Sequence, residues 1–469
     1  MTDRPMSPMQ LAFHYLGELV NPNSGELITL DGPLDVTLLR RAIDRALQRH
    51  PLLNCVPIKK RGKVFWRRSD TPLPIDLRVH HTRESCEANL LPELWRNLWD
   101  EPLPQDGRQV RFVYTEGPQR SYLQICAPHT VTDACSGTRL AADIALAYTA
   151  LQLGEPWQAE PVAPLERPAA EVFLSGLSVV QRFSVALETS RRIIRDVFTR
   201  GSGLHLASTT KPGATTVTVT EVSEDLLQRT LTQARRHHTT AHSVFLLALT
   251  RARSEFLGKR GEEHFRINDF ATLRPFADRD LSDAFDVLVV PNQISIDPNW
   301  DDSTVLRRVS KRMQAQKDGA ILSELYRLSL YGFLGRFLPT RMTAGLVFKH
   351  INKTDLAVTN PGRVPWQDSL SRFGDVEVLD FLNFPHLLPP AKAVLIFTTF
   401  RGRLRVVQLH DSRATPEGIE QTVVEPFIRH LSDLVGSLSS TAPVVEEAVA
   451  VVGPAAMPLT GFRRRQFNS

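Results

Sequence analysis

Apolar residues recur at helical spacing early in the chain. In "LDVTLLRRAIDRALQRHPLL" they form one stripe of an amphipathic helix: Leu38, Leu39, Ala42, Ile43, Ala46 and Leu47. Asp35 stands where an N-cap belongs, and Pro51 ends the helix. A similar pattern returns 188 residues later, with Ser223 as the corresponding cap. This repetition fits either two related lobes or two ordinary amphipathic helices.

Elsewhere the pattern changes to the two-residue alternation of strands. "KVFWRR" and "VRFVYTEGPQRSYLQICAP" predict strands, and the turn "EGPQ" folds the second stretch into a hairpin. Its alternation continues to His129 and places that residue on the face of Leu123 and Ala127. "SGTRLAADIALAYTALQLG" then predicts a helix that Gly154 ends.

The arrangement of these segments predicts two lobes. Four prolines within the sixteen residues "GEPWQAEPVAPLERPA" mark a linker. A long helix is predicted over 170–199, followed by a Gly/Ser/Thr-rich loop and by alternating strands and helices, which indicates a mixed α/β fold. We predict an N-terminal lobe at 1–153, a linker, crossover helix and loop at 154–215, a C-terminal lobe at 216–440 and a loosely ordered tail at 441–469.

Composition narrows the class of protein. The chain has 469 residues, 42% of them hydrophobic, which is enough for one large core or two ordinary ones. Its start has no apolar signal segment, and no uncharged apolar run reaches ~18 residues, so we expect a soluble cytoplasmic protein without a transmembrane segment. The four cysteines lack CxxC spacing and predict neither a zinc site nor a disulfide scaffold. The net charge of +5 comes with no nucleic-acid-binding signature.

Residues 124–137, "QICAPHTVTDACSG", carry the candidate chemistry. His129 follows an apolar strand, Asp133 lies four residues later, and a small-residue turn and an apolar helix come next. An imidazole in such a place can be presented at the junction of two lobes as a general base. A buried structural histidine can have the same spacing to an acid by chance, so the motif gains its weight from its setting.

That setting resembles the chloramphenicol-acetyltransferase-like superfamily, which includes condensation domains of nonribosomal peptide synthetases, BAHD-type enzymes and stand-alone acyltransferases. "PLDVTLLRRAIDRALQRHPLL" is similar to the first helix of condensation-like proteins, and "PHTVTDACSG" matches their HHxxxDG segment. "TTAHSVFLLALTRA", "NDFATLRPF", "VPNQIS", "TNPGR" and "GRLRVVQLHD" match later landmarks in the same order. The resemblance covers about residues 8–440 and implies two lobes with a channel between them.

The resemblance also implies a role for each motif residue. His129 corresponds to the second, catalytic histidine of HHxxxDG and is the predicted base. Asp133 is expected to point away from the substrate and to brace the turn by pairing with Arg274 in "TLRPF". Two positions depart from the family pattern, because Pro128 replaces the first histidine and Ala134 replaces the glycine. The loss of the first histidine argues against a peptide-condensing role.

Negative charge on the thioester oxygen needs hydrogen-bond donors. The predicted donors are the backbone around Ser136 and Gly137, and less directly Asn360. Asn360 is better explained as a turn residue before Pro361-Gly362 than as a catalytic residue, and Asn292 after a proline has the same explanation.

The predicted activity is transfer of an acyl group from a thioester, either acyl-CoA or a phosphopantetheine-linked acyl carrier protein, to a small-molecule hydroxyl. It needs no covalent acyl-enzyme, no metal and no permanently bound cofactor. A nucleophilic Cys135, six residues from His129, is an alternative within the same segment. Two further alternatives are amide or ester formation on carrier proteins and a catalytically silent docking scaffold.

Overall fold

The structure is a computed structural model that describes residues 3–440 of the chain, with gaps. The gaps are 18–20, 22, 61–62, 86, 100, 105–106, 158, 163–168, 199–214, 259–263, 278–279, 335–336, 340–341, 343–353, 386, 388–390 and 415–417. The tail at 441–469 and most of the predicted Gly/Ser/Thr-rich loop therefore lie outside the described residues.

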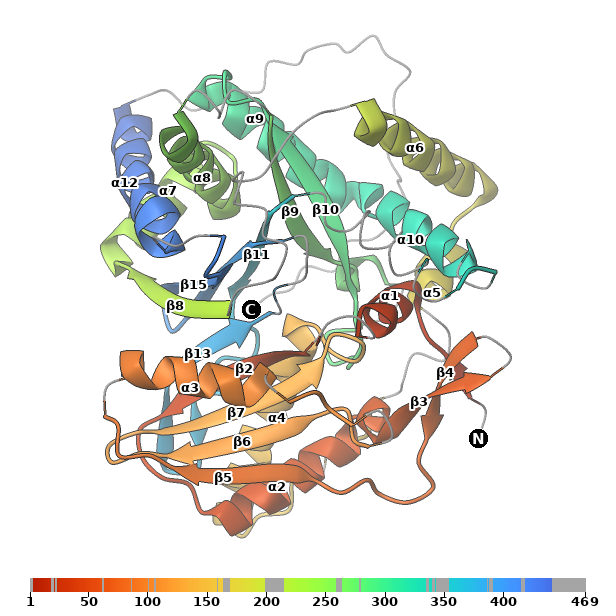
Figure 1. Ribbon diagram of the computed structural model, residues 1–469, viewed down its shortest axis with the longest axis vertical. Helices are drawn as coiled ribbons and strands as arrows, with labels where there is room; N and C mark the ends of the chain where they lie inside the picture. The colour runs from red at the N-terminus through yellow and green to blue at the C-terminus, as the bar shows by residue number, and fades with distance from the viewer. Residues whose placement is uncertain are drawn as a thin grey trace.

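The first lobe is built on a six-stranded sheet with the order β12-β13-β2-β7-β6-β5 (Figure 1). Its strands are β2 Asn23–Leu30, β5 Asp76–His81, β6 Arg111–Glu116, β7 Ser121–Pro128, β12 Arg372–Phe373 and β13 Val376–Phe384. Helices α2 (Val36–Arg49) and α4 (Ala134–Gln152) pack on one face, where apolar residues of all these layers form one core. Helix α3 (Glu87–Trp99) lies on the other face.

A small sheet with the order β1-β4-β3 extends this lobe. It consists of β1 Arg4–Pro5, β3 Cys55–Lys60 and β4 Lys63–Arg68, and a 3-10 turn at Pro51–Asn54 leads into it from α2. The predicted helix with Asp35 as its N-cap is confirmed, because the Asp35 carboxylate accepts hydrogen bonds from two backbone N–H groups of the first turn. The predicted hairpin of β6 and β7 is also confirmed.

The second lobe has a six-stranded sheet with the order β10-β9-β11-β14-β15-β8. Its strands are β8 Thr215–Val222, β9 Phe265–Thr272, β10 Val289–Ile296, β11 Leu356–Arg363, β14 Ala393–Phe400 and β15 Arg403–Asp411. Its outer face is covered by helices and a π-helical turn: α7 Glu224–Arg236, α8 Ala241–Leu257, α9 Asp302–Ala315, η5 Glu420–Val424 and α12 Glu425–Ser440. Ser223 caps α7, as predicted.

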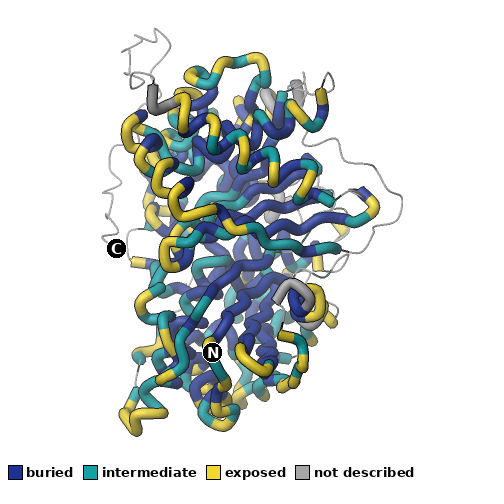
Figure 2. The backbone as a smooth tube through the Cα atoms, turned by 90° about the vertical axis from the view of Figure 1, so that its left-hand side faces the viewer, coloured by how far each residue is buried: buried dark blue, intermediate teal, exposed yellow. Residues whose placement is uncertain are grey.

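The inner faces of the two sheets share a core, in which Leu27 and Cys126 of the first lobe pack with Val394 and Ile396 of the second and with α3. Figure 2 shows the buried backbone running through both sheets, with exposed segments on the outside. The predicted two-lobe, mixed α/β fold is thus confirmed. Among the described residues, no helix is both long and apolar enough to span a membrane.

One part of the predicted lobe boundary is wrong. β12 and β13 lie within 216–440, but β13 pairs antiparallel with β2 and completes the first sheet. The chain therefore returns to the first lobe after β11 and leaves it again before β14. Strand pairing over so long a sequence separation leaves no local signal in the sequence. The other boundaries stay predictions.

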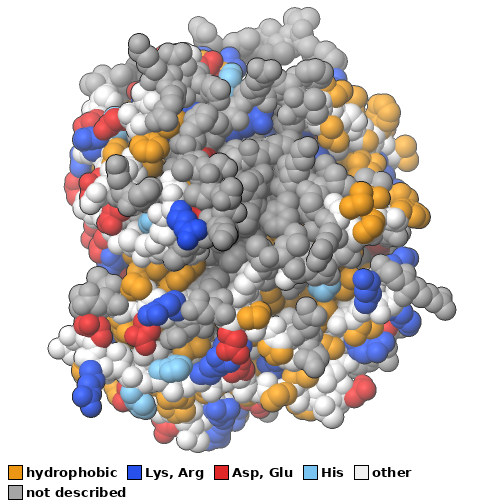
Figure 3. Space-filling model, in the orientation of Figure 1, with side chains coloured by type: hydrophobic (Ala, Val, Ile, Leu, Met, Phe, Trp, Pro, Cys, Tyr) orange, Lys and Arg blue, Asp and Glu red, His pale blue; other side chains and the backbone are white. Residues whose placement is uncertain are grey.

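A third group of helices lies where the lobes meet. α1 (Pro8–Gly17), α5 (Ala169–Ser175) and α10 (Leu322–Leu334) share a core with the segment around the 3-10 turn η3 (Arg274–Phe276), and a π-helical turn η4 (Gln316–Ala320) precedes α10. The helix predicted over 170–199 is two helices, because α6 (Val179–Phe198) begins anew at Ser178, which exchanges capping bonds with Gln181. Exposed apolar side chains of α6 and α10 form the orange patch on the right of Figure 3.

Candidate active site

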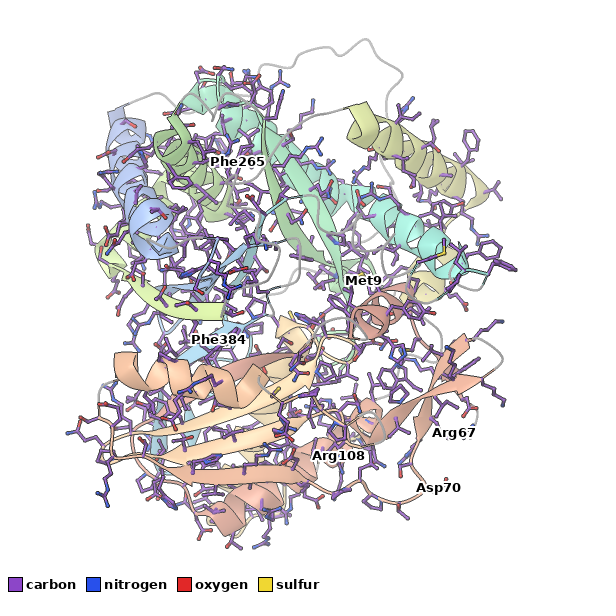
Figure 4. The ribbon with its side chains drawn as sticks, in the orientation of Figure 1. Met9, Arg67, Asp70, Arg108, Phe265 and Phe384 are labelled. Atoms are coloured by element: carbon purple, nitrogen blue, oxygen red, sulfur yellow. The ribbon has the colours of Figure 1, made fainter. Side chains whose placement is uncertain are left out.

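A cavity of about 120 Å³ lies between the lobes. The first lobe and α1 contribute Phe13, Ser24, Glu26, His129 and Asp133, and the second contributes Phe270, Val289, Ala357, Thr359 and Ile396. β13 of the first sheet contributes Asn383 and Phe384, and Figure 4 places Phe384 at the junction of the lobes. Apolar side chains dominate the lining, so a polar group in this cavity meets little competing water.

His129 stands at the first position after β7. The strand ends at Pro128, so the alternation predicted to reach His129 stops there, and the imidazole does not join Leu123 and Ala127 in the core. It lines the cavity instead, with its ring centroid 4.9 Å from that of Phe13. The turn after the strand therefore aims the ring between the lobes.

Two features prepare His129 to accept a proton. Its Nδ1 lies 2.9 Å from the carbonyl oxygen of Thr132, which can only accept, so Nδ1 carries the proton and Nε2 has the lone pair. Nε2 has no hydrogen-bond partner among the described residues. Burial lowers the pKa of His129, while the Thr132 carbonyl and the charge of Asp133 act in the opposite direction. The imidazole is consequently neutral near pH 7.

Asp133 points away from the imidazole and holds the turn. It is the N-cap of α4, where its Oδ1 accepts from the Ser136 backbone N–H at 2.9 Å. Arg274 donates to both carboxylate oxygens, at 2.7 and 3.0 Å, and the Leu288 backbone N–H donates at 2.9 Å. Burial alone would raise the pKa of Asp133, but the charge and hydrogen bonds of Arg274 lower it below its usual range.

The turn is thereby fastened to the segment that leads into β10. Arg274 also donates to the Ala284 carbonyl, and the Ser136 hydroxyl accepts from the Asp286 backbone N–H at 3.2 Å. Asp286 in turn accepts a hydrogen bond from Gln10 of α1 at 2.8 Å. Hydrogen bonds thus link three segments far apart in sequence: α1, the start of α4 and the segment 274–288.

The predicted oxyanion donors are engaged elsewhere. The Ser136 N–H is bonded to Asp133, and the Gly137 N–H donates to the Asp133 carbonyl at 2.9 Å within α4. Asn360 donates to His242 at 3.2 Å and accepts from the Gly362 N–H at 2.9 Å, and it lies at an irregularity of β11 whose neighbouring residues line the cavity. We therefore assign no oxyanion role to these three residues. Asn292 lies in β10 and accepts a hydrogen bond from Gln316.

Cys135 sits in the first turn of α4 and is a thiol. Burial raises its pKa, although the charge of Arg274 acts in the opposite direction. A thiol in this state is a poor nucleophile, which weakens the alternative of a covalent acyl-cysteine. No group of three or more metal-ligating side chains occurs within the described ranges.

Two polar residues of the cavity were missed in the sequence. Glu26 of β2 is 4% exposed and Asn383 of β13 is 6% exposed, and both line the cavity beside His129. Burial, and secondly the charge of Asp133, raise the pKa of Glu26 to about 8. The sequence does hold a signal for Glu26. The two-residue period of the strand puts this acid on the same face as Ile28 and Leu30, where an apolar residue is expected.

The two-lobe fold is similar to that of condensation domains. Among solved structures, the first condensation domain of the CDA synthetase is similar over 95% of this chain and 98% of its own, with a TM-score of 0.71 and 16% sequence identity. The starter condensation domain of the rhizomide synthetase RzmA, in a complex of a variant with C8-CoA, matches over 94% and 96%, with a TM-score of 0.67 and 15% identity.

The chain therefore has the condensation-domain fold, as the sequence resemblance implied. A curated relative, a probable non-canonical nonribosomal peptide synthetase CymA of Salinispora arenicola (strain CNS-205), is 31% identical over 164 residues, which are 34% of this chain. The match spans about 2% of the length of that relative. No family model matches the chain.

Replacing Asp133 with Ala is expected to destabilise the protein by roughly 3–5 kcal/mol, because it leaves the buried Arg274 guanidinium without a counter-ion. Replacing both partners, as in Asp133→Ala with Arg274→Met, should cost less than the sum of the two single changes. The measurement is urea unfolding of the three variants. Asp225→Ala is the control, since it breaks the exposed Asp225–Arg229 pair at 2.8 Å and should cost under about 1 kcal/mol. A loss at Asp133 no larger than at Asp225 would contradict the assignment.

The raised pKa of Glu26 predicts a pH-dependent stability. The folded-state pKa is about 8 against 4.5 for the free group, so the native state binds the proton more tightly. The contribution of Glu26 is complete below pH 4.5 and is lost as the pH rises to 8, with a slope of about 1.4 kcal/mol per pH unit at most. Glu26→Gln should reduce the pH dependence of the free energy of unfolding between pH 4.5 and 8. A matched change at an exposed acid, Glu93→Gln, should leave that pH dependence as it is in the wild type. Parallel pH curves for wild type and Glu26→Gln would refute the prediction.

Proposed function

We propose that the chain is an acyltransferase that moves an acyl group from a thioester to an acceptor hydroxyl, with His129 as general base. The observation that carries this proposal is a neutral imidazole that lines a cavity between two lobes, with its Nδ1 bonded to Thr132 and its Nε2 without a partner among the described residues. A base held in one tautomer needs no rearrangement before it accepts a proton. The condensation-domain fold supports the proposal.

The reaction proceeds by direct transfer. Nε2 of His129 takes the proton of the acceptor hydroxyl as its oxygen attacks the thioester carbonyl carbon. The tetrahedral intermediate then collapses, the carbon–sulfur bond breaks, and the imidazolium returns the proton to the departing thiolate. The products are an ester and a free thiol, and every proton is accounted for without a covalent acyl-enzyme.

Asp133 acts through the turn and not on the substrate. Both of its oxygens are occupied by Arg274 and by backbone N–H groups, so it fixes the start of α4 and with it the Thr132 carbonyl that orients His129. It is a positioning residue in this proposal, and so is Arg274.

The donor is proposed to be an acyl-CoA or an acyl group on the phosphopantetheine of a carrier protein, and the acceptor a small molecule. A variant of the RzmA starter condensation domain has been solved in complex with C8-CoA, which supports a thioester donor. The apolar lining of the cavity suits an acyl chain. No resident metal or cofactor takes part. The proposed compartment is the cytoplasm.

A second candidate is ester or amide formation on carrier proteins, which the similarity to a nonribosomal peptide synthetase favours. Pro128 in place of the first motif histidine favours a third, a docking scaffold without catalysis. Both differ from the first proposal in what they require. The second requires a carrier-linked donor, and the third requires no base.

The test is an assay of the purified chain against a panel of acyl-CoAs and acyl carrier proteins with alcohol and amine acceptors, read by mass spectrometry. His129→Ala should lower kcat at least about 100-fold, since general-base catalysis contributes at least that much. Because the pKa of His129 is lowered, kcat/KM should reach half of its plateau value at a pH below 6.5.

Cys135→Ala is the matched control and should keep wild-type kcat. A stable acyl adduct on Cys135 would replace direct transfer with a covalent route. Turnover with carrier-linked donors alone would select the second candidate, and full pathway function with His129→Ala would select the scaffold.

A further inference from the structure

Glu26 and Asn383 form a pair across two neighbouring strands. In the antiparallel ladder of β2 and β13 the two residues stand directly opposite each other, so their side chains project from the same face of the sheet. Both line the cavity of His129 and both are more than nine-tenths buried. They come from chain segments more than 350 residues apart, and only the crossing of β13 into the first sheet brings them together.

Neither side chain has its hydrogen-bonding capacity satisfied by the protein. The Asn383 Nδ2 is buried and has no hydrogen-bond partner among the residues that the structure describes. Within the described part of the chain, the Glu26 carboxyl also has no hydrogen bond to another residue. A buried polar group without a partner costs about 1–3 kcal/mol, so such groups in a cavity indicate a ligand that supplies the missing bonds.

The helix opposite makes room for this pair. A Cβ on Gly137, in the first turn of α4, would lie 1.8 Å from Oε1 of Glu26. Gly137 therefore does not donate to an oxyanion but leaves the space that the Glu26 carboxyl occupies. The Ser24 hydroxyl, on the same strand, is already bonded to the Ala127 carbonyl at 3.3 Å, and so it does not satisfy the pair.

The charges nearby decide which chemical group fits. A ligand carboxylate would stand next to Asp133, whose charge acts on Glu26. An ammonium group can only donate and would leave the Asn383 Nδ2 unpaired. A neutral oxygen can accept from the Asn383 amide and from a protonated Glu26 carboxyl together, in the way that a buried, neutral carboxylic acid donates elsewhere.

We propose that Glu26 and Asn383 bind an uncharged oxygen substituent of the acyl group, so that the substrate is a hydroxyacyl or oxoacyl thioester. This proposal rests on the proposed acyltransferase function, and it names the acyl donor of that site. The apolar remainder of the lining, including Val289, Ala391 and Ile396, holds the hydrocarbon part of the chain. An unsubstituted acyl group would leave two buried polar groups unpaired and is selected against.

The experiment measures binding, so that it does not depend on turnover. His129→Ala protein is titrated calorimetrically with acyl-pantetheine analogues in which an amide replaces the thioester, at one chain length, bearing 2-hydroxy, 3-hydroxy, 3-oxo or no substituent. At least one oxygenated analogue should bind about tenfold or more tightly than the plain one. Comparing the hydroxy with the oxo analogues shows which of the two oxygen substituents the site prefers.

The pair is tested with matched substitutions in the same background. Glu26→Gln keeps a donor and an acceptor and should keep the preference, whereas Glu26→Met has a similar volume and should abolish it. Asn383→Leu should reduce it independently. Thermal unfolding confirms that each variant is folded, and two variants on different strands ensure that one failure to fold does not decide the matter.

The pH dependence of analogue binding is a further test of the proposal. The titratable groups around the Glu26 carboxyl are Asp133, which Arg274 already pairs, His129, which is absent from the His129→Ala protein, and the buried Cys126 thiol of β7. Above about pH 8 an ionised Glu26 cannot donate, so affinity for the oxygenated analogue should fall. In Glu26→Gln it should stay level.

Equal affinity for plain and oxygenated analogues in the His129→Ala protein, or a preference that survives Glu26→Met, would overturn the proposal. So would failure of every analogue to bind. A preference that depends on Glu26 while His129→Ala leaves turnover in the enzyme assay unchanged would instead uphold this site and reject the proposed role of His129.

Discussion

The ion pair of Asp133 and Arg274 is the interaction on which the geometry of the site depends. The carboxylate closes the first turn of α4, receives the guanidinium from η3 and receives the Leu288 N–H from the approach to β10. A buried carboxylate with that many donors cannot move without leaving several groups unpaired. The turn between β7 and α4 is consequently rigid, and the Thr132 carbonyl that it carries fixes the tautomer of His129.

In this turn Asp133 and His129 have separate hydrogen-bond partners, although the spacing of the motif would allow the acid to pair with the imidazole. Asp133 bonds to Arg274 and the backbone, while the imidazole bonds to Thr132, so the acid does not accept a proton from His129. The imidazole stays neutral because its surroundings are apolar, and Phe13 packs against its ring. Pro128 is the last residue of β7, a position at the end of a strand where proline is tolerated.

Much of the fold could be predicted from local patterns, since helical periodicity and caps at Asp35 and Ser223 are properties of neighbouring residues. The pairing of Asp133 with Arg274 was expected from the family resemblance, and its distance of 2.7 Å agrees with that expectation. The partnership of Glu26 with Asn383 could not be predicted, because it depends on the register between β2 and β13. The same crossing of β13 into the first sheet explains why the predicted lobe boundary differs from the observed sheets.

Two buried carboxyl groups beside the same helix start have opposite properties, and the reason lies in their partners. Arg274 lowers the pKa of Asp133, whereas no described cation acts on Glu26, and burial raises its pKa to about 8. A site that keeps one carboxyl group ionised and the other protonated can use the first in an ion pair and the second as a hydrogen-bond donor. The negative charge of Asp133 helps to keep Glu26 protonated, since it raises the pKa of Glu26. The ion pair that braces the turn before α4 and the polarity of the cavity are therefore one electrostatic unit, and a change at Asp133 reaches the cavity through Glu26 as well as through His129.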